Sequence, residues 1–499
     1  MCPHVRSVIR ATAFVCLVSL GPPSSCELVG LGIRDKAAFI SRLAWTGSTR
    51  PHSPAKVTHR GSSLCEMTTP APKRVVRRVA VIGAGIGGLA LAKALCTLDT
   101  GVDEVEVFEK YDSVKPGVGG GIQINSGAVV LARLGLGEAV KASGNPVERI
   151  LARTIGGRTV LDLNVGKMIR SDPARESVMV DCGTPMVFTI MRDRLMQILA
   201  GSLPEGVLKT GRDVVDIMQS PGGATLRFSD GSESGPFDVV VGADGIKGVV
   251  RGALKTGRGA GTPRGSSDAI YSGLRVQFGV APGGQRPRGC ERELHQWFGG
   301  DTYALSATYG GIEGAKYEMV AAVYQDFSRK DENAEWDPAL AKETCIDRLV
   351  ERNFPAEMID VAEAGERFFE LGVYYRNPLE GWVSGGRGQV VLLGDAAHAM
   401  PPNLGQGANQ AIQDAYCLAE RLAVLNRGGY DGSLPDALRD YERRRKPDTT
   451  SILAKSAIIG KVETLGGVAG EAFRNNFFFG TWKLGVAERV FMDGAMPKV

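Results

Sequence analysis

Near residue 80, three glycines have the spacing of a phosphate-binding turn. Gly83, Gly85 and Gly88 form the pattern G-x-G-x-x-G between an apolar strand-like run, RRVAVIG, and a helix-like segment, IGGLALAKAL. Glycines at this spacing permit a tight turn, a close approach of the backbone to a pyrophosphate, and close packing of helix on strand. The pyrophosphate then lies at the helix N-terminus, where N–H groups and the helix dipole favour negative charge. The pattern predicts dinucleotide binding, and its alternative is a glycine turn that serves packing only.

Three carboxylates follow strand-like runs at positions where a nucleotide could be bound. Glu109 ends EVEVFE, 21 residues after Gly88, where a carboxylate can accept hydrogen bonds from a ribose. Asp244 follows FDVVVGA, but in isolation this is more often an ordinary Asp-Gly turn. Asp395 ends VVLLGD, at the carboxyl edge of a predicted sheet, where doubly wound folds bind their ligands.

The stretch GDAAHAMPPNLGQG, residues 394–407, carries little side-chain bulk around Asp395. The small residues would let a flat cofactor come close. Gly405 and Gly407 lead into a helix that begins near Ala408, and the N–H groups at its start would meet the electron-rich edge of an isoalloxazine. His398 in this stretch is interpreted as a structural histidine rather than a catalytic one.

No acid–base pair at a fixed spacing is found, so the catalytic residues stay unknown. His295 lies beside Trp297 in a strand-like run and either lines the substrate face or lies on the surface of an edge strand. Only His295 and His398 lie beyond residue 72, and the nine cysteines include no C-x-x-C pair, so no metal site is expected. Acidic and basic residues nearly balance beyond residue 70, which gives no argument for nucleic acid binding.

Residues 1–72 have the composition of a two-part targeting leader that is removed. Arg6 and Arg10 precede the apolar run ATAFVCLVSL, which is too short to span a bilayer, and the following segment is rich in Arg, Ser and Thr and poor in acids. A signal peptide followed by a transit peptide is similar to the leaders of algae with secondary plastids, so the stroma or thylakoid membrane of a plastid is the expected location. The alternative is a disordered N-terminal tail.

The order of the elements predicts an α/β fold with two interleaved parts. A Rossmann-like FAD-type nucleotide domain is expected over 73–265 and 366–450, interrupted by an antiparallel-sheet substrate domain over 266–365, with part of 150–190 contributing to the latter. Helices are expected over Val129–Val140 and Arg192–Leu203. Residues 451–499 would form a helical C-terminal segment.

Taken together in this order, GAGIGG with Glu109, GADG with Arg251, and GDAAHAMPPNLGQGANQAIQDA resemble the single-component FAD monooxygenases of the aromatic hydroxylase type, and within them the zeaxanthin epoxidases. GGIQINSGAVVLARLG, FTIMRDRLMQIL and VFMDGAMP strengthen the likeness, which covers roughly residues 75–497. One departure is Gly248, where the family often has Ser.

The resemblance implies roles for individual residues. Arg192 would contact the phosphates or ribityl chain of FAD, Asp395 the ribityl hydroxyls, and Asp244 would serve both FAD and NADPH. Ala408 and Asn409 would offer backbone N–H groups to the flavin. The expected cofactor-binding set is Gly83, Gly85, Gly88, Glu109, Arg192, Asp244, Asp395, Gly405, Gly407, Ala408 and Asn409. Tyr271, Trp297 and Tyr303 are candidates to line an apolar substrate slot, or else to pack in the core.

The resemblance also implies an activity and partners. NADPH, or ferredoxin with its reductase, would reduce FAD, and a flavin C4a-hydroperoxide would epoxidise a lipid-soluble xanthophyll with O₂ as co-substrate. The aromatic segment 473–492 would contact a membrane surface or else pack on the FAD domain. Two alternatives stay open: a salicylate-type aromatic-ring hydroxylase, and a non-catalytic flavin-binding protein.

Overall fold

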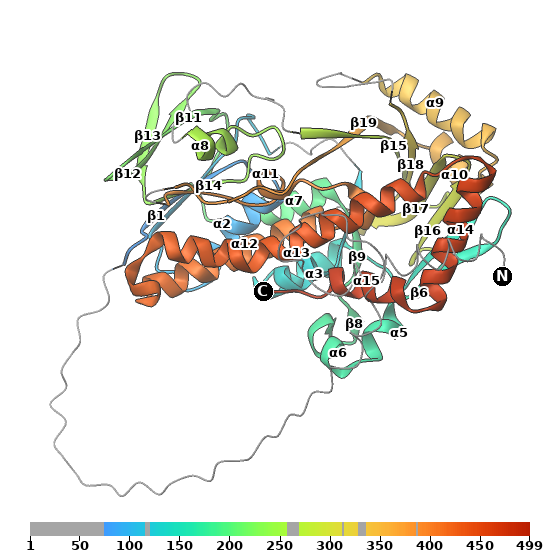
Figure 1. The fold of residues 1–499 in the computed structure, drawn as a ribbon, viewed down its shortest axis with the longest axis horizontal. Coiled ribbons are helices and arrows are strands. Elements are labelled where there is room, and N and C mark those ends of the chain that lie inside the picture. The colour runs from blue at the N-terminus through green and yellow to red at the C-terminus, as the bar shows by residue number, and fades with distance from the viewer. Residues whose placement is uncertain (1–73, 115–119, 257–268, 312–313, 328–335, 386–387) are drawn as a thin grey trace, which may run out of the picture. The chain divides into compact units, whose positions relative to one another are not determined.

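The computed structural model describes residues 74–114, 120–256, 269–311, 314–327, 336–385 and 388–499 (Figure 1). The predicted leader lies outside these residues. Among the described helices, none has both the length and the apolar character needed to cross a membrane.

A five-stranded parallel sheet forms the nucleotide-binding half of the fold. Its strand order is β10-β2-β1-β14-β20. The strands are β1 (Arg78–Ile82), β2 (Glu104–Phe108), β10 (Leu208–Lys209), β14 (Val239–Gly242) and β20 (Val390–Leu392). Strands β1, β14 and β20 are buried and almost entirely apolar because helices cover a parallel sheet from both sides. The predicted α/β fold is confirmed, and strands far apart in the sequence end side by side at one sheet edge.

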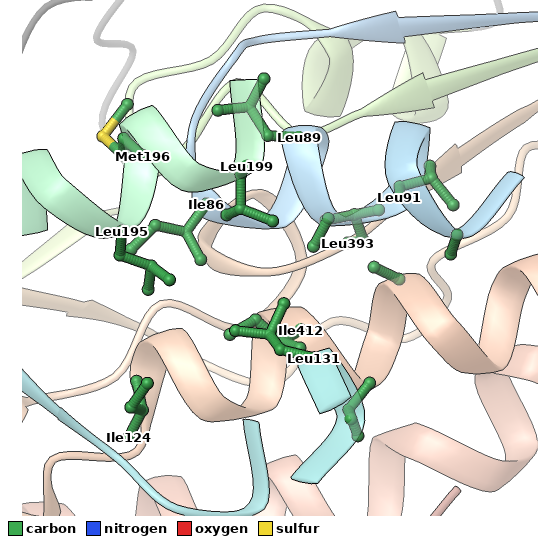
Figure 2. Close-up of a cluster of buried hydrophobic side chains, with 14 of the residues drawn as sticks. Ile86, Leu89, Leu91, Ile124, Leu131, Leu195, Met196, Leu199, Leu393 and Ile412 are labelled. Atoms are coloured by element: carbon green, nitrogen blue, oxygen red, sulfur yellow. The ribbon is translucent and has the colours of Figure 1, made fainter. Parts of the chain in front are cut away.

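Helices pack around this sheet through aliphatic side chains. Figure 2 shows Ile86, Leu89 and Leu91 of α2 in one cluster with Leu199 and Ile412. The helices concerned are α2 (Ile86–Thr97), α3 (Ser126–Arg133), α7 (Arg192–Gly201) and α12 (Gly407–Asn426). Burial of this cluster fixes the N-terminal ends of α2, α7 and α12, which face the site described below.

A larger, ten-stranded mixed sheet forms the second half. Its path is β19-β15-β18-β17-β16-β5-β6, with β3, β4 and β9 attached beside it. The strands are β3 (Gly121–Ile124), β4 (Asn145–Pro146), β5 (Arg149–Thr154), β6 (Thr159–Asn164), β9 (Phe188–Met191), β15 (Ala269–Pro282), β16 (Glu293–Gly299), β17 (Thr302–Gly310), β18 (Lys316–Gln325) and β19 (Arg367–Arg376). Strand β19, which the sequence prediction assigned to the nucleotide domain, pairs along its length with β15.

The two faces of the large sheet have different partners because side chains alternate along each strand. One face packs against α9 (Pro338–Glu351) and α10 (Ala356–Glu363) through a separate cluster that includes Val320 and Ala322 (Figure 1). The opposite face carries Met319 and Ala321 and lines a cavity. Whether a residue of these strands can contact a ligand therefore depends on which of the two faces its side chain lies on.

From residue 407 on, the chain is largely helical. Helix α13 (Leu434–Glu463) runs beside α12 (Figure 1), and α14 (Gly467–Lys483) and α15 (Val486–Ala495) follow it. The remaining elements are α4 (Gly137–Ser143), α5 (Val165–Arg170), α6 (Pro173–Met179), β7 (Val180–Asp181), β8 (Thr184–Pro185), β11 (Val214–Ser220), β12 (Gly223–Phe228), β13 (Glu233–Phe237), α8 (Val250–Thr256), α11 (Asp395–His398), η2 (Pro402–Leu404) and η3 (Gly429–Gly432).

One predicted helix is in fact two. The expected helix over Val129–Val140 ends at Arg133, and α4 starts again at Gly137. Gly135 between them has a φ of 78°, a left-handed conformation that cannot continue a helix and that glycine adopts at little cost. The helix predicted over Arg192–Leu203 is α7.

Candidate functional site

The glycine turn between β1 and α2 has the close approaches that its pattern predicts. A Cβ atom on Gly88 would lie 2.0 Å from the Gly83 carbonyl oxygen, and one on Gly83 would lie 2.6 Å from the Ala243 carbonyl oxygen. No heavy atom lies within 4 Å of a Cβ built on Gly85. Two of the glycines thus close the turn, while Gly85 opens onto free space at the N-cap of α2, where a pyrophosphate would approach.

Glu109 stands at the end of β2 beside this turn. Its carboxylate accepts hydrogen bonds from the backbone N–H groups of Ala84, at 2.9 Å, and Tyr111, at 3.1 Å. These contacts fix the carboxylate at the edge of the turn. The remaining acceptor positions of its two oxygens can serve ribose hydroxyls.

A cavity of about 760 Å³ extends from the glycine turn to the large sheet. Six of the eleven predicted cofactor residues line it: Gly85, Arg192, Asp395, Gly405, Gly407 and Ala408. The other five stand behind or beside its wall: Gly83, Gly88, Glu109, Asp244 and Asn409. Residues from three widely separated sequence motifs therefore meet at one place.

Asp395 and Arg192 bring opposite charges into this cavity from α11 and α7. Asp395 faces the cavity, where the surrounding protein removes water from its carboxyl group and so raises the pKa of that group. The charges of His398 and Arg192 act in the opposite direction. Burial lowers the pKa of the Arg192 guanidinium, and Asp395 opposes that shift. A carboxylate and a guanidinium on one wall suit the hydroxyls and phosphates of a nucleotide cofactor.

Asp244 lies just behind the wall, at the end of β14. Its Oδ2 accepts a hydrogen bond of 3.0 Å from the Val250 N–H, while no described residue donates to its buried Oδ1. Burial raises the pKa of this carboxyl group to about 6. A Cβ on Gly248 would lie 2.0 Å from the Asp244 Cγ, so glycine at position 248 is what lets the carboxylate occupy this position.

The start of α12 forms the opposite wall. Gly407 is open to the cavity, since nothing lies within 4 Å of a Cβ built there, and no side chain caps this helix. The Asn409 side chain is fully buried and binds the backbone on both sides: its Oδ1 accepts from Asn125 N–H and Gly127 N–H, and its Nδ2 donates to Gln123. Asn409 thus anchors the helix terminus that would meet the flavin.

The donor set fits FAD. Gln123 also lines the cavity, and its buried Nε2 has no hydrogen-bond partner among the described residues, which makes it a further contact that the sequence did not reveal. Gly85 would admit the pyrophosphate, Asp395 and Arg192 the ribityl chain and phosphates, and Gly407 and Ala408 the flavin ring. FAD bound there would supply the redox chemistry and the activation of O₂.

His398 lies below this wall in a buried ionic cluster. Its Nε2 is 2.5 Å from Asp414 Oδ2, and Arg445 Nε donates to Asp414 Oδ1 at 2.8 Å. Burial alone would raise the pKa of Asp414, but His398 and Arg445 outweigh it and hold the pKa at about 2. Asp414 also accepts from the Gly394 N–H, at 3.0 Å, so the cluster holds the turn that presents Asp395.

The substrate end of the cavity lies against the large sheet and is mostly apolar. Its lining includes Val276, Phe278, Leu294, Leu305, Met319, Leu371, Phe477 and Phe478. None of the three predicted substrate residues belongs to this lining: Tyr271 donates to the Asp326 carbonyl, Trp297 to Glu357, and Tyr303 is buried behind the wall. Because side chains alternate along β16, Trp297 lies on the face away from the cavity, and its neighbour Gln296 faces the cavity instead.

A buried carboxylate at the substrate end escaped the sequence prediction. Glu463, the last residue of α13, lines the cavity and accepts hydrogen bonds from Gln296 Nε2, at 2.8 Å, and Asn403 Nδ2, at 2.9 Å. Asn403 also donates to the Tyr303 hydroxyl, at 2.9 Å. One signal could have found Glu463: residues 452, 455, 459 and 463 recur at helical spacing along one stripe of α13, and all four line the cavity.

His295 takes neither of the two predicted places. It is 3% exposed on the α10 side of the sheet, with Nε2 2.8 Å from Glu293 and Nδ1 3.1 Å from Glu357. Together with Glu293 and Cys290 it forms a group with ligand atoms within 4.8 Å of one another, the spacing of a possible metal site among the described residues. Both imidazole nitrogens already have carboxylate partners, so the cluster is satisfied by its own hydrogen bonds.

Comparison with known proteins agrees with this geometry. Residues 77–456 match the model of the FAD binding domain family. The chain is 31% identical to a 3-amino-4-hydroxybenzoate 2-monooxygenase of Streptomyces platensis, over 76% of this chain and 86% of that protein. It is also 31% identical to the chloroplastic zeaxanthin epoxidase of Solanum lycopersicum, over 90% of this chain and 65% of that protein.

Among solved structures, HpxO of Klebsiella pneumoniae, complexed with FAD and uric acid, has a similar fold. The TM-score is 0.64 at 20% sequence identity, over 84% of this chain and 96% of that one. The family model spans most of the chain, and one cavity brings together the glycine turn, Asp395 and the start of α12. The chain therefore belongs to the FAD-dependent monooxygenases of the aromatic hydroxylase type.

Proposed function

We propose that the protein is a zeaxanthin-type epoxidase, which transfers one oxygen atom from O₂ to a ring double bond of a xanthophyll. The second oxygen atom would leave as water, with two electrons supplied by NADPH or by reduced ferredoxin through its reductase. FAD, once bound and reduced, supplies the activation of O₂. The chain's own task is then to hold the alkene near the flavin and to keep water out.

The charge of the cavity lining carries this proposal. Only two cations, Arg192 and Lys455, belong to the described lining. Arg192 stands on the FAD side, and Lys455 forms a 2.8 Å ion pair with Asp493. A benzoate-type substrate would bury a carboxylate, which needs a cation to offset its loss of hydration. A neutral, mostly hydrocarbon ring fits such a lining without that requirement.

The size of the cavity limits what can enter. About 760 Å³ must hold FAD from its pyrophosphate to its isoalloxazine ring as well as the reacting part of the substrate. This space suits one ring end of a carotenoid, and its long polyene would extend beyond the cavity. Phe477 and Phe478 of α14 contribute to the wall of this end and would exclude water from the alkene.

A second function, hydroxylation of a phenol ring, is favoured by one observation. Glu463 is a buried carboxyl group in the cavity whose pKa burial raises to about 7, so it could accept a phenolic proton near neutral pH. The similarity of this chain to a 3-amino-4-hydroxybenzoate 2-monooxygenase supports this alternative.

The location and the membrane contact complete the proposal. We propose that the enzyme works in a plastid and takes its substrate from a membrane surface through the outer side of α14. On that helix and its C-cap, Val468 is 92% exposed, Phe473 37% and Leu484 60%. We expect these apolar side chains to enter the lipid interface and the exposed Lys483 to meet the headgroups.

Oxygen consumption tests the choice between the two functions. The full-length protein, loaded with FAD, is supplied with NADPH or with ferredoxin and its reductase. We expect zeaxanthin in lipid vesicles to stimulate oxygen uptake, and salicylate and 3-amino-4-hydroxybenzoate to leave it at the basal rate. Stimulation by the benzoates alone would favour the hydroxylase.

A further inference from the structure

Three polar side chains from distant parts of the chain meet in the apolar end of the cavity. Gln296 comes from β16, Asn403 from η2 and Glu463 from the last turn of α13, and all three line the cavity. Each Glu463 oxygen accepts one amide hydrogen, Oε1 from Gln296 and Oε2 from Asn403. The neighbouring lining is hydrocarbon, such as Leu294 and Ile459. The cavity therefore has one polar corner.

The carboxyl group at this corner is costly to keep. Glu463 is 4% exposed, and burial raises its pKa to about 7, although hydrogen bonds from Gln296, Asn403 and Tyr303 and the charge of Arg474 act in the opposite direction. It also stands at a helix C-terminus, where the helix dipole disfavours negative charge. The Arg474 guanidinium donates to the backbone carbonyls of Gly300 and Leu465. Stability alone does not explain a carboxylate here.

The surrounding chain is shaped to hold this corner. A Cβ on Gly460 would lie 2.7 Å from Asn403 Oδ1, so glycine at that position lets Asn403 reach Glu463. One turn earlier, the buried Ser456 hydroxyl donates to the Pro401 carbonyl at 2.6 Å and ties α13 to the loop that carries Asn403. The polar side chains are thus set in place before a ligand arrives.

We infer that Glu463, with Gln296 and Asn403, forms a subsite that binds a hydroxyl group of a neutral, otherwise apolar substrate ring. A carboxylate has about four acceptor positions, and Gln296 and Asn403 each occupy one of them, which leaves room for a hydroxyl donor. The inference rests on the proposed function in one respect: it takes this cavity as the place where the substrate ring reacts. Glu463 would set which end of the ring enters and would select hydroxylated rings over their hydrocarbon parents.

Binding to matched ligand pairs tests this subsite without turnover. The full-length, FAD-loaded protein is titrated with zeaxanthin and β-carotene in detergent micelles, and with 4-phenylphenol and biphenyl, by the change in flavin fluorescence and absorbance. We expect the hydroxylated member of at least one pair to bind about tenfold tighter, the effect of one hydrogen bond to a charged group. In Glu463→Gln the preference should fall to within about threefold. Glu442→Gln, on the same helix but outside the cavity lining, is the matched control.

The pH dependence separates binding from a purely structural role. Because the ionised carboxylate is the better acceptor, the wild-type preference should grow as pH rises from 5 to 8, and that of Glu463→Gln should stay flat. Retained flavin absorbance and near-UV circular dichroism check that the variant is folded. If Glu463→Gln weakens both members of a pair equally, or if no pair shows a preference, the inference is wrong. A preference in the phenol pair alone would keep the subsite and overturn the xanthophyll proposal.

Discussion

A Cβ atom on Gly88 would lie 2.0 Å from the carbonyl oxygen of Gly83, so these two residues close the turn between β1 and α2 by direct backbone contact. Replacing Gly88 with alanine must open that turn. We expect Gly88→Ala to weaken FAD binding by at least tenfold, measured by quenching of FAD fluorescence on titration with apoprotein. Gly201→Ala, where no heavy atom lies within 4 Å of the new Cβ, should bind FAD normally.

Gly85→Ala tests contact with the cofactor without changing the shape of the turn. Apart from its chain neighbours, no atom of the described residues lies within 4 Å of its Cβ, so the apoprotein should keep the stability of the wild type. The methyl group would, however, project where the pyrophosphate approaches, and FAD affinity should fall. Normal FAD affinity in this variant would contradict the placement of the pyrophosphate at the start of α2.

Asp414 should make stability depend on pH in the acid range. Its folded-state pKa of about 2 lies below the ordinary value near 3.9. The ionised form therefore stabilises the fold above about pH 4, and this contribution is lost as pH falls through about 2. Asp414→Asn leaves His398 and Arg445 without their carboxylate and should lower the free energy of unfolding by about 3 kcal/mol at pH 7.

Urea unfolding measured between pH 2 and pH 7 checks this contribution. The difference between wild type and Asp414→Asn should shrink toward pH 2. The exposed Asp99→Asn serves as the control and should change stability by less than about 0.5 kcal/mol. A difference that is constant over this pH range would show that the Asp414 charge plays no part.

Glu463 should make stability depend on pH in the opposite sense to Asp414. Its folded-state pKa is raised from 4.5 to about 7, so its contribution is fully present below about pH 4.5 and is lost as pH rises through about 7. At pH 8 the glutamine variant avoids burying that charge, and Glu463→Gln should raise the free energy of unfolding by up to about 3 kcal/mol, since one pKa unit is worth about 1.4 kcal/mol. Urea midpoints at pH 5 and pH 8 measure this, and a gain confined to pH 5 would contradict it.

Membrane contact through α14 can be tested with its exposed apolar side chains. Phe473→Ser combined with Leu484→Ser should reduce co-flotation of the protein with galactolipid vesicles several-fold. The control pair, Leu340→Ser with Val350→Ser, removes comparably exposed apolar residues from α9. Equal losses from both pairs would mean that α14 is not the contact surface.

The fold and the cofactor side of the site were predictable because their signals are local. Gly83, Gly85 and Gly88 stand within six residues, and Asp395 lies in one stretch with Gly405 and Gly407. Backbone conformation and helix termini set the geometry there, so spacing carries the information. The family model over residues 77–456 confirms the dinucleotide binding that the glycine spacing predicted and the FAD that the resemblance implied.

The substrate side was harder because its residues meet only through the tertiary fold. Alternation in β16 shows that Gln296 and Trp297 face opposite sides, but it does not say which side carries the cavity, and the prediction chose Trp297. Glu463 meets Gln296 across 167 residues of chain and Asn403 across 60. His295 was placed at a surface or in the pocket, whereas α10 covers it and supplies Glu357 as its partner.

The most direct test of the proposed activity is oxygen incorporation under ¹⁸O₂. The full-length protein with FAD, NADPH or reduced ferredoxin, and zeaxanthin in lipid is analysed by chromatography and mass spectrometry. The account predicts a product that carries one ¹⁸O atom for each oxidised ring. Unlabelled zeaxanthin, recovered beside phenols that do acquire ¹⁸O under the same conditions, would contradict it.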